Sequence, residues 1–327
     1  MDNLIGSLEL SLNVSNELYN TISPHPRFSQ FKKTFKTNQE ERRRRTLENQ
    51  KQSRYDYFNH CRCLAENEFS VGNESISEDS PDEMEWSPPK IQTPRTYQDQ
   101  IMLSEWLVEV PEDFETSWLV MPCPIGKRCL VVASRGWTKV YSKSGFLITE
   151  FQSVLPGGFR QSSDSTILDC LWDQCKQCYF VLDVLSWSGV PLLGCEAEFR
   201  FYWISGKFNE HPELGIKSAK NRYAFIPLSV SPCTKENIEA LLVNEKDIWL
   251  PLDGLLFYHK LGFYTPRVSP LVGWLKPFMI SEVLKAKVPE FYMQKKPISY
   301  VNIQQHLKKH NPTVKFEKRS AEMSTTN

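Results

Sequence analysis

The sequence predicts an α+β fold, in which a mixed β-sheet domain follows a long basic α-helical arm. After Tyr97, short aliphatic and aromatic runs alternate with clusters of Gly, Pro and Ser, a pattern typical of strands. Two stretches between these runs, near Glu196–Phe208 and Thr234–Asn244, have helical character. From Gln39 to Leu64, helix-forming residues dominate and neither Pro nor Gly interrupts them. The strand-like runs are numerous enough for one mixed sheet or two sheets.

Charge is distributed unevenly along the 327 residues. The 39 Lys and Arg residues balance the 39 Asp and Glu residues, yet a basic stretch near residues 26–62 precedes an acidic one near 66–86. The mean hydropathy is −0.43, so we expect the globular part to be shorter than the chain.

Cysteine content and apolar runs bear on the cellular compartment. The nine cysteines have no regular spacing and an odd total, which argues against a secreted disulfide framework and predicts free thiols. The opening residues, from Met1 to Leu4, do not resemble a secretory signal. No apolar run reaches the roughly 20 residues that a membrane span needs. We therefore expect a soluble cytosolic or nuclear protein.

The first residues carry an apolar stripe at helical spacing, formed by Met1, Leu4, Leu8, Leu12 and Val14. A helix of this length is marginal in water unless its stripe packs against another surface. N-terminal helices commonly pack on their own domain. Here the basic arm and the acidic linker separate the stripe from the folded core, which favours a groove on another protein.

The basic arm contains four consecutive arginines, and its cations are Arg27, Arg42, Arg43, Arg44, Arg45, Lys51 and Arg54. A helix that is polar on all sides either lies in solvent or packs on an acidic partner. Consecutive arginines repel one another, which indicates that a counter-charge is used. RNA phosphates, an anionic membrane and an acidic protein groove remain alternatives.

Composition divides the chain into five segments. Residues 66–94 are rich in Glu, Asp, Ser and Pro, which is typical of a disordered linker, and residues beyond Lys295 form a basic, extended tail. The predicted segments are an apolar epitope at 1–15, the basic arm at 16–65, the linker at 66–94, the folded domain at 95–294 and the tail at 295–327.

Two tryptophan motifs, Leu103-Ser104-Glu105-Trp106 and Gly273-Trp274-Leu275-Lys276-Pro277, frame the folded domain. Tryptophan stacks well on a flat, positively charged ring. Most tryptophans are core residues, but the place of Trp274 between a Gly and a Pro at a strand end favours a presented ring.

Basic residues lie beside glycines at several strand ends, including Gly126-Lys127-Arg128 and Lys143-Ser144-Gly145. Such residues can approach phosphates closely, although ordinary surface hairpins have the same pattern. The pair Cys175-x-x-Cys178 lies in a predicted hairpin turn without a second pair or a suitably spaced His, so we expect no metal site. No nucleophile elbow or phosphate loop occurs.

The chain resembles the snurportin family along its folded part. The resemblance is carried by HPRFSQFK, ERRRR, QIMLSEWL, GKRCLVVASRG, YSKSGF, LPGG, TILDC, YFVLDV, FRFYW, PLDGLLFYHK and PLVGWLKP. It implies a nuclear import adaptor that binds the 2,2,7-trimethylguanosine cap of small nuclear RNA in a guanylyltransferase-like domain. It further implies that the arm binds importin-β and that the apolar epitope binds a leucine-type exportin with Ran-GTP. The adaptor would be a monomer without cofactor or membrane contact, shuttling between cytoplasm and nucleus.

The resemblance also implies a cap site. Trp274 would stack on the base, with Leu103, Ser104 and Trp106 as a wall beside the methylated amine. Phosphate and ribose contacts would come from Gly126, Lys127, Arg128 and Lys143. The floor would be formed by Cys123, Ile167 and Trp203.

The alternatives are a capping-type guanylyltransferase and a general RNA-binding protein. Guanylyltransferases use the lysine of a Lys-x-Asp-Gly-x-Arg motif as nucleophile. The similar stretch here has Cys123 in place of that lysine and Ile125 in place of the aspartate. Without the amine no phosphoramidate forms. About 50 residues follow Pro277, too few for the closing OB-fold domain plus a tail. The sequence therefore favours a binder over an enzyme.

Overall fold

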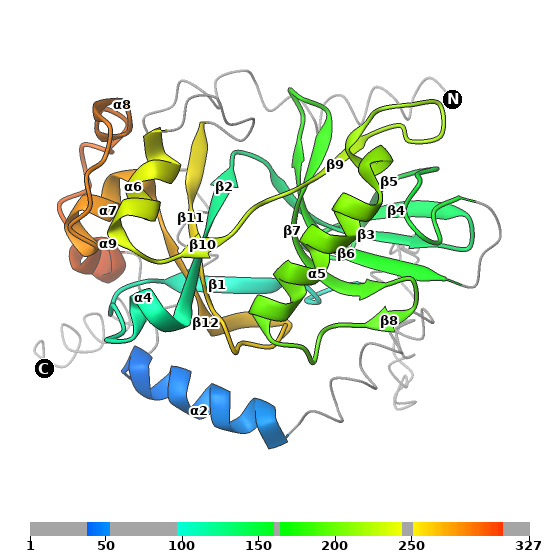
Figure 1. Ribbon diagram of the computed structural model, residues 1–327. Coiled ribbons are helices and arrows are strands. Elements are labelled where there is room, and N and C mark those ends of the chain that lie inside the picture. Colours follow the sequence, from blue (N-terminus) through cyan, green and yellow to red (C-terminus); the bar gives the residue numbers. More distant parts are fainter. Residues whose placement is uncertain (1–37, 53–96, 160–163, 244–250, 310–327) are drawn as a thin grey trace, which may run out of the picture. The chain divides into compact units, whose positions relative to one another are not determined.

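The computed structural model describes residues 38–52, 97–159, 164–243 and 251–309 (Figure 1). The described residues separate into two compact units, a larger one that ends at Pro277 and a smaller one that begins at Phe278. The larger unit contains both β-sheets and helix α2.

The first sheet of the larger unit has five strands, of which one pair is parallel. In spatial order these strands are β1 (Met102–Trp106), β12 (Arg267–Leu275), β11 (Leu252–His259), β2 (Trp118–Pro124) and β10 (Ser231–Pro232). Strand β1 runs parallel to β12, and the other neighbours are antiparallel. The β1–β12 pair shifts register after Ser104, opposite a stretch of β12 that contains Pro270. Proline cannot donate a ladder hydrogen bond, so it is accommodated at such an irregularity.

The second sheet is antiparallel along its main path. Its spatial order is β5 (Leu147–Phe151), β4 (Trp137–Ser142), β3 (Lys127–Ser134), β6 (Ser165–Asp173), β7 (Cys178–Trp187) and β8 (Val190–Pro191), with β9 (Ala224–Pro227) parallel to β7. Every position of β7 is buried on both faces. Strands β2 and β3 are separated by two residues, so the chain passes directly from one sheet to the other.

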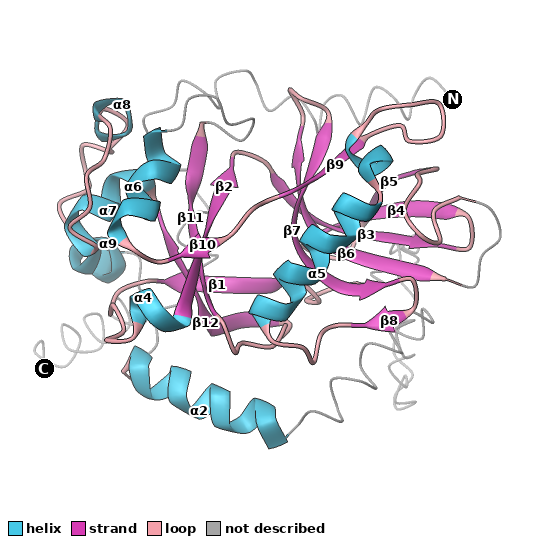
Figure 2. Cartoon of the chain, viewed as in Figure 1, coloured by secondary structure: helices cyan, strands magenta, loops and turns pink. Residues whose placement is uncertain are grey.

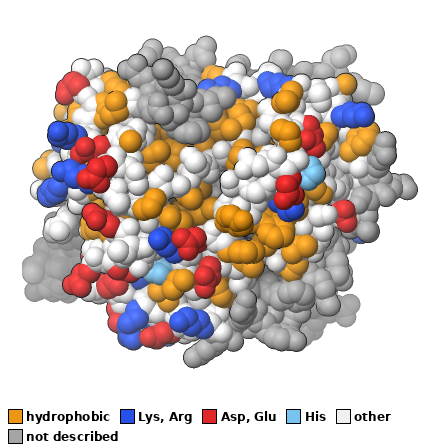
Figure 3. Space-filling model, viewed as in Figure 1, with side chains coloured by type: hydrophobic (Ala, Val, Ile, Leu, Met, Phe, Trp, Pro, Cys, Tyr) orange, Lys and Arg blue, Asp and Glu red, His pale blue; other side chains and the backbone are white. Residues whose placement is uncertain are grey.

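Helix α5 (Ala197–Glu210) packs against β7 through a stripe of Ala197, Arg200, Phe201, Ile204 and Phe208 (Figure 2). The buried Arg200 guanidinium pairs with the buried Asp183 carboxylate, at 2.8 Å for both oxygens, which satisfies both charges. The outer face of α5 exposes apolar rings, 45% of Phe199 and 76% of Tyr202. Apolar side chains gather on this face of the molecule (Figure 3).

Four further helices complete the larger unit. They are α2 (Gln39–Gln52), α4 (Phe114–Ser117), the 3₁₀ helix η3 (Pro212–Gly215) and α6 (Lys235–Val243). Both helices predicted within the folded domain are confirmed as α5 and α6, and the predicted helix after Gln39 is confirmed up to Gln52. The α+β class with mixed sheets is therefore confirmed.

Three helices follow the sheets, namely α7 (Pro277–Val283), α8 (Glu290–Met293) and α9 (Ile303–Lys309). The first two lie within the predicted folded domain, whereas α9 is a helix in the segment predicted as an extended tail. Glu282 joins two of these helices, because its carboxylate accepts hydrogen bonds from the Tyr300 hydroxyl at 2.7 Å and from the Ile303 amide at 2.9 Å. Local helix propensity and the contacts of Glu282 together give this segment a defined structure, which its uneven, Lys-rich composition did not predict.

Several predictions fall outside the described residues. They concern the apolar stripe of residues 1–14, the linker at 66–94 and the end of the tail. Among the described helices, none combines the length and the apolar character that crossing a bilayer requires.

Candidate functional site

Two of the predicted tryptophans meet across the parallel strand pair of the first sheet. Trp106, at the end of β1, is the register partner of Trp274 on β12. The preceding register shift brings Glu105 opposite Gly273 instead of the next residue of an unbroken ladder. The irregularity therefore places the two indole-bearing positions side by side. Leu103 and Ser104, the other predicted wall residues, lie half-buried on the same strand.

The Trp274 ring packs against a glycine on the neighbouring strand. A Cβ atom at Gly254 would lie 2.5 Å from Cζ2 and 2.6 Å from Cη2 of Trp274, so only a glycine admits the ring. Gly254 is in turn the register partner of Cys123 on β2. The structure thus brings Trp106, Trp274 and Cys123 into one region of the first sheet.

The prediction that Trp274 presents its ring is wrong for this structure. Only 6% of Trp274 and 4% of Trp106 are exposed. The flat approach to Gly254 explains this burial for Trp274, because the glycine leaves room for the indole against the sheet. A ligand that stacks on Trp274 would have to open one face of the ring.

A cation already lies over the Trp274 ring. The Lys276 Nζ is 5.7 Å from the ring centroid, within the range of a cation–π interaction. The same ammonium donates a hydrogen bond to Asp253 Oδ1. The π-face of Trp274 is therefore already occupied by a cation, and a carboxylate balances the charge of that cation.

Arg128 lies in an ion pair at the second sheet. Its Nε and Nη2 donate to the two carboxylate oxygens of buried Asp169, at 2.5 and 2.6 Å, and Nη2 also donates to the Met102 carbonyl at 3.2 Å. The Tyr264 hydroxyl donates to Asp169 at 2.8 Å and accepts from the Met102 amide at 3.0 Å. Burial disfavours the guanidinium, but Asp169 more than offsets this and raises the pKa of Arg128. Arg128 thus ties β3 and β6 to β1.

The remaining predicted phosphate-binding residues lie around Arg128. Gly126 is exposed between β2 and β3, and a Cβ there would come within 2.9 Å of the Trp172 carbonyl. Lys127 is exposed at the start of β3. Burial lowers the pKa of half-buried Lys143, and the charge of Arg128 lowers it further. An anion beside Lys143 would relieve this repulsion.

Ile167 and Trp203 are placed elsewhere. Ile167 is fully buried in β6 and pairs with Val132, five residues along β3 from Lys127, or about 17 Å at strand spacing. Trp203 lies on α5, where its ring contacts Phe199 at 5.9 Å and the Lys207 ammonium at 5.2 Å. Ile167 thus belongs to the second sheet and Trp203 to α5, whereas Trp106 and Trp274 belong to the first sheet.

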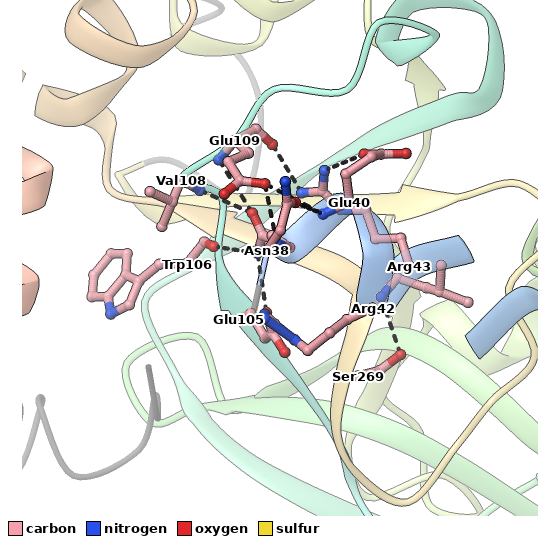
Figure 4. Close-up of polar contacts among 11 residues, drawn as sticks. Asn38, Glu40, Arg42, Arg43, Glu105, Trp106, Val108, Glu109 and Ser269 are labelled. Atoms are coloured by element: carbon pink, nitrogen blue, oxygen red, sulfur yellow. Dashed lines mark hydrogen bonds and ion pairs between the residues drawn. The ribbon is translucent and has the colours of Figure 1, made fainter. Parts of the chain in front are cut away.

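The arginine block lies on helix α2, close to the first sheet. Arg42 and Arg43 face Glu105 and Glu109 of the sheet domain, whereas Arg44 and Arg45 are exposed (Figure 4). Part of the arginine block thus contacts acidic residues of its own chain, and binding of the arm to a separate acidic protein stays a prediction. Lys51 is exposed near the helix end. Arg27, Arg54 and the apolar stripe from Met1 to Val14 lie outside the described residues.

Cys175 lies in the β6–β7 turn, as predicted, and Cys178 is the first residue of β7. The Asp173 carboxylate accepts hydrogen bonds from the Cys175 and Lys176 amides, at 2.9 and 3.0 Å, and so closes the turn. Burial raises the pKa of the Cys178 thiol to about 11, which keeps it protonated. Within the described ranges, no group of three or more His, Cys, Asp or Glu side chains has an arrangement that could hold a metal ion.

Sequence reasoning missed four carboxylates, namely Glu105, Glu109, Asp169 and Asp253. Asp253 stands before a glycine at a strand start, and Glu105 lies inside the first tryptophan motif. Their places in the sequence could therefore have marked both as candidate site residues. Asp169 and Glu109 carried none, because their partners are more than 40 residues away in the chain.

Comparison with protein families gives two matches. A model described as the Snurportin1 m3G cap-binding domain matches residues 100–277, and one described as Snurportin1 matches residues 25–63. Together they cover both the sheet domain and the basic arm.

Solved structures with a similar backbone include DNA ligases. The ligase domain of LigD from M. tuberculosis is 14% identical with a TM-score of 0.39, and the match covers 54% of this chain and 59% of that domain. A Lig E DNA ligase is 12% identical with a TM-score of 0.36, over 54% of this chain and 68% of that one. The chain therefore spans about three fifths of the LigD domain.

Proposed function

The chain belongs to the snurportin family, and from this premise we propose that it is a nuclear import adaptor for RNA carrying a 2,2,7-trimethylguanosine cap. Residues 100–277 form the cap-binding domain of the family. In the proposed function the cap base stacks on Trp274, and the adaptor carries the capped small nuclear RNA with its bound proteins to importin-β.

One observation carries the proposed base site, namely the Trp106–Trp274 pair with a cation held over Trp274. Methylation at N7 makes the cap guanine a flat cation. Such a ring is attracted to the π-face that Lys276 occupies here. The two methyl groups on N2 remove hydrogen-bond donors and add apolar surface, which suits a wall formed by Leu103 and Trp106.

The phosphate bridge would lie on the basic side of the site. Gly126 offers a backbone without a side chain, and Lys127 and Lys143 supply positive charge. Arg128 would act chiefly by positioning, because its Nε and Nη2 already hydrogen-bond to protein groups. Affinity should fall only modestly with salt, since few phosphates take part.

The partners of the arm follow from its charge. Arg27, Arg42 to Arg45, Lys51 and Arg54 would bind an acidic inner surface of importin-β, and the stripe from Met1 to Val14 would bind a leucine-type exportin with Ran-GTP. Export would return the empty adaptor to the cytoplasm, so the protein would shuttle between both compartments.

A pull-down with capped RNA tests the bridging function. Importin-β should be retained on trimethyl-capped RNA only when this chain is present, and replacing Arg42 to Arg45 by alanine should abolish retention while cap binding persists. Retention on uncapped RNA to the same extent would instead indicate general RNA binding. A covalent adduct with labelled GTP on a denaturing gel would indicate a guanylyltransferase. If the alanine variant still bound both importin-β and the cap, the assignment of the arm as the importin-β-binding segment would be refuted.

A further inference from the structure

Helix α2 is docked on the sheet domain by its first turn. Asn38 Oδ1 accepts a hydrogen bond from the Glu40 amide at 2.7 Å, and Glu109 Oε2 accepts from the amides of Gln39 and Glu40, at 3.1 and 3.3 Å (Figure 4). These amides have no partner within a helix. A carboxylate at this end also opposes the positive end of the helix dipole. Glu109 therefore fixes the start of α2 from a distant part of the chain.

The side chain of Gln39 is buried in the same contact. Its Nε2 donates to Glu105 Oε2 at 3.1 Å and to the Trp106 carbonyl at 2.9 Å. Its Oε1 accepts from the amides of Val108 and Glu109, at 3.3 and 3.2 Å. One amide side chain thus satisfies four groups at the end of β1.

Two arginines of the block face the domain. Arg42 Nη2 donates to Glu105 Oε2, and the Arg43 guanidinium donates to the Glu109 carbonyl at 2.9 Å. Arg43 also lies 5.1 Å from the centroid of the buried Trp118 ring, and only 2% of Arg43 is exposed. Half of the four-arginine block is therefore directed towards the domain.

The other end of α2 is fixed by a second buried amide. Gln50 Nε2 donates to the Leu261 carbonyl at 2.6 Å, and Gln50 Oε1 accepts from the Phe263 amide at 3.0 Å. Gln50 is 211 residues from Leu261 in the chain. Both ends and the middle of α2 thus contact one docking surface, formed by Glu105, Trp106, Glu109, Trp118, Leu261 and Phe263.

On the opposite, exposed face of α2, positive and negative side chains pair with one another. Arg44 pairs with Glu41 at 2.8 Å and with Glu48 at 2.9 Å, and all three side chains are more than half exposed. An acidic partner that approaches the docked helix meets these compensated charges, together with Arg45 and Lys51. It cannot reach the buried Arg43, or take Arg42 from Glu105, without displacing the helix.

Docking of α2 removes the Arg43 guanidinium from water, and this costs free energy. The cost allows a better-matched surface to displace the helix. Burial lowers the pKa of Arg43, although Glu40 partly opposes this effect. Arg43 Nε is buried without a hydrogen-bond acceptor among the described residues. A surface that satisfies this guanidinium completely would compete with the docking surface.

We propose that α2 is a self-docked receptor-binding helix, held on the docking surface in the free chain and released when an acidic import receptor takes over Arg42 and Arg43. The inference rests on the proposed function for the identity of the receptor. It explains why a helix with no apolar face of its own is ordered in the absence of a partner. It also makes Glu105 a determinant of receptor affinity without contact to the receptor.

Two variants of the full chain test the inference at opposite ends of the helix. Glu105→Gln removes the charge that holds Arg42, and Gln50→Ala removes both hydrogen bonds to the segment after β11. Glu115→Gln is the matched control, because Glu115 is an exposed carboxylate of the same domain and takes part in none of the contacts of α2 described above. Hydrogen exchange of the α2 amides is measured first, followed by importin-β affinity, and thermal melting verifies folding.

The inference predicts protected α2 amides in the wild-type chain and faster exchange in Glu105→Gln and in Gln50→Ala. A helix of this length has little protection on its own. Because docking competes with the receptor, both variants should bind importin-β about tenfold more tightly, with Glu115→Gln unchanged.

Two results would overturn the inference, namely unprotected α2 amides in the wild-type chain, or unchanged receptor affinity in both variants despite loss of protection. If no form of the chain binds importin-β, the proposed receptor is wrong. The exchange data then still decide whether α2 is docked.

Discussion

Trp106 and Trp274 occupy matching positions on two parallel strands, and the β1–β12 irregularity after Ser104 produces this alignment. In an unbroken register, Trp106 would be paired with Leu271 rather than with Trp274. The first sheet thus creates its tryptophan pair by a local departure from regular pairing. Bulges that re-aim a side chain are common next to binding sites.

Replacing Trp274 by alanine should weaken cap binding by about 5-fold to 150-fold, because base stacking on an aromatic ring is worth about 1–3 kcal/mol. Quenching of tryptophan fluorescence by a trimethylated dinucleotide cap measures this. Trp274→Phe separates stacking from folding, since it keeps an aromatic ring. Trp137→Ala is the matched control and should keep wild-type affinity, because Trp137 is exposed and pairs with Ser134, at the opposite end of β3 from Lys127. Unchanged affinity in folded Trp274→Ala would refute stacking on this ring.

Asp253 is expected to select a cationic base. Its carboxylate accepts a hydrogen bond from Lys276, which lies over the Trp274 ring, and a methylated guanine that displaces the ammonium would gain Asp253 as counter-charge. Asp253→Asn should therefore reduce the preference for an N7-methylated over an unmethylated cap, by about tenfold for a loss near 1.4 kcal/mol. Parallel titrations with the two caps measure the ratio. An equal loss for both caps would show that Asp253 acts on the fold or on the phosphates instead.

Removing the charge of buried Asp169 should destabilise the domain by about 3–5 kcal/mol, because the half-buried Arg128 would lose its paired carboxylate. Denaturant unfolding of Asp169→Asn measures the change. Asp99→Asn is the control, since Asp99 and its partner Arg267 are both exposed and their ion pair spans 3.5 Å. It should cost less than about 1 kcal/mol. A wild-type unfolding free energy for Asp169→Asn would contradict the role of this pair in tying β3 and β6 to β1.

His259 makes stability depend on pH. Burial lowers its pKa from the usual 6.5, Arg43 lowers it further, and Asp113 and Glu40 oppose the shift. Nδ1 accepts a hydrogen bond from the Leu261 amide at 3.2 Å, which requires the neutral ring. The unfolded chain gains this proton near pH 6.5, whereas the folded chain gains it only at lower pH.

Between these two pKa values the unfolded state binds more protons, so the free energy of unfolding should fall as pH is lowered below about 6.5. The loss is about 1.4 kcal/mol for each unit by which the two values differ. Thermal melting between pH 7.5 and 5.5 measures it, and His259→Gln should flatten this part of the profile. An identical profile in the variant would show that other groups titrate.

The sequence predicted the elements whose signal is local. Strands β6 and β7 are continuous apolar runs, and α5 and α6 have helical character, so each was found from its own residues. Strand β5, by contrast, exposes Leu147 and Ile148 and has no core-facing pattern to reveal it. Helix α9 lies in Lys-rich sequence and is anchored through Glu282, which composition does not show.

The sequence predicted the aromatic residues of the site better than it predicted the partners of its charged residues. The two tryptophan motifs, far apart in the chain, meet as neighbours. The burial of Trp274 was not foreseen, since it depends on the absent Cβ of Gly254 across the strand pair. Similarly, no local pattern links Arg42 to Glu105, because that contact joins residues 63 positions apart. Long-range ion pairs are decided by the tertiary fold.

The most direct test is a side-by-side titration of the full chain with trimethylated, N7-monomethylated and unmethylated dinucleotide caps. A cationic base stacked on Trp274 beside an apolar wall predicts the tightest binding for the trimethylated cap and the weakest for the unmethylated one. Equal affinity for all three caps would contradict the central claim that this domain recognises the methylated base.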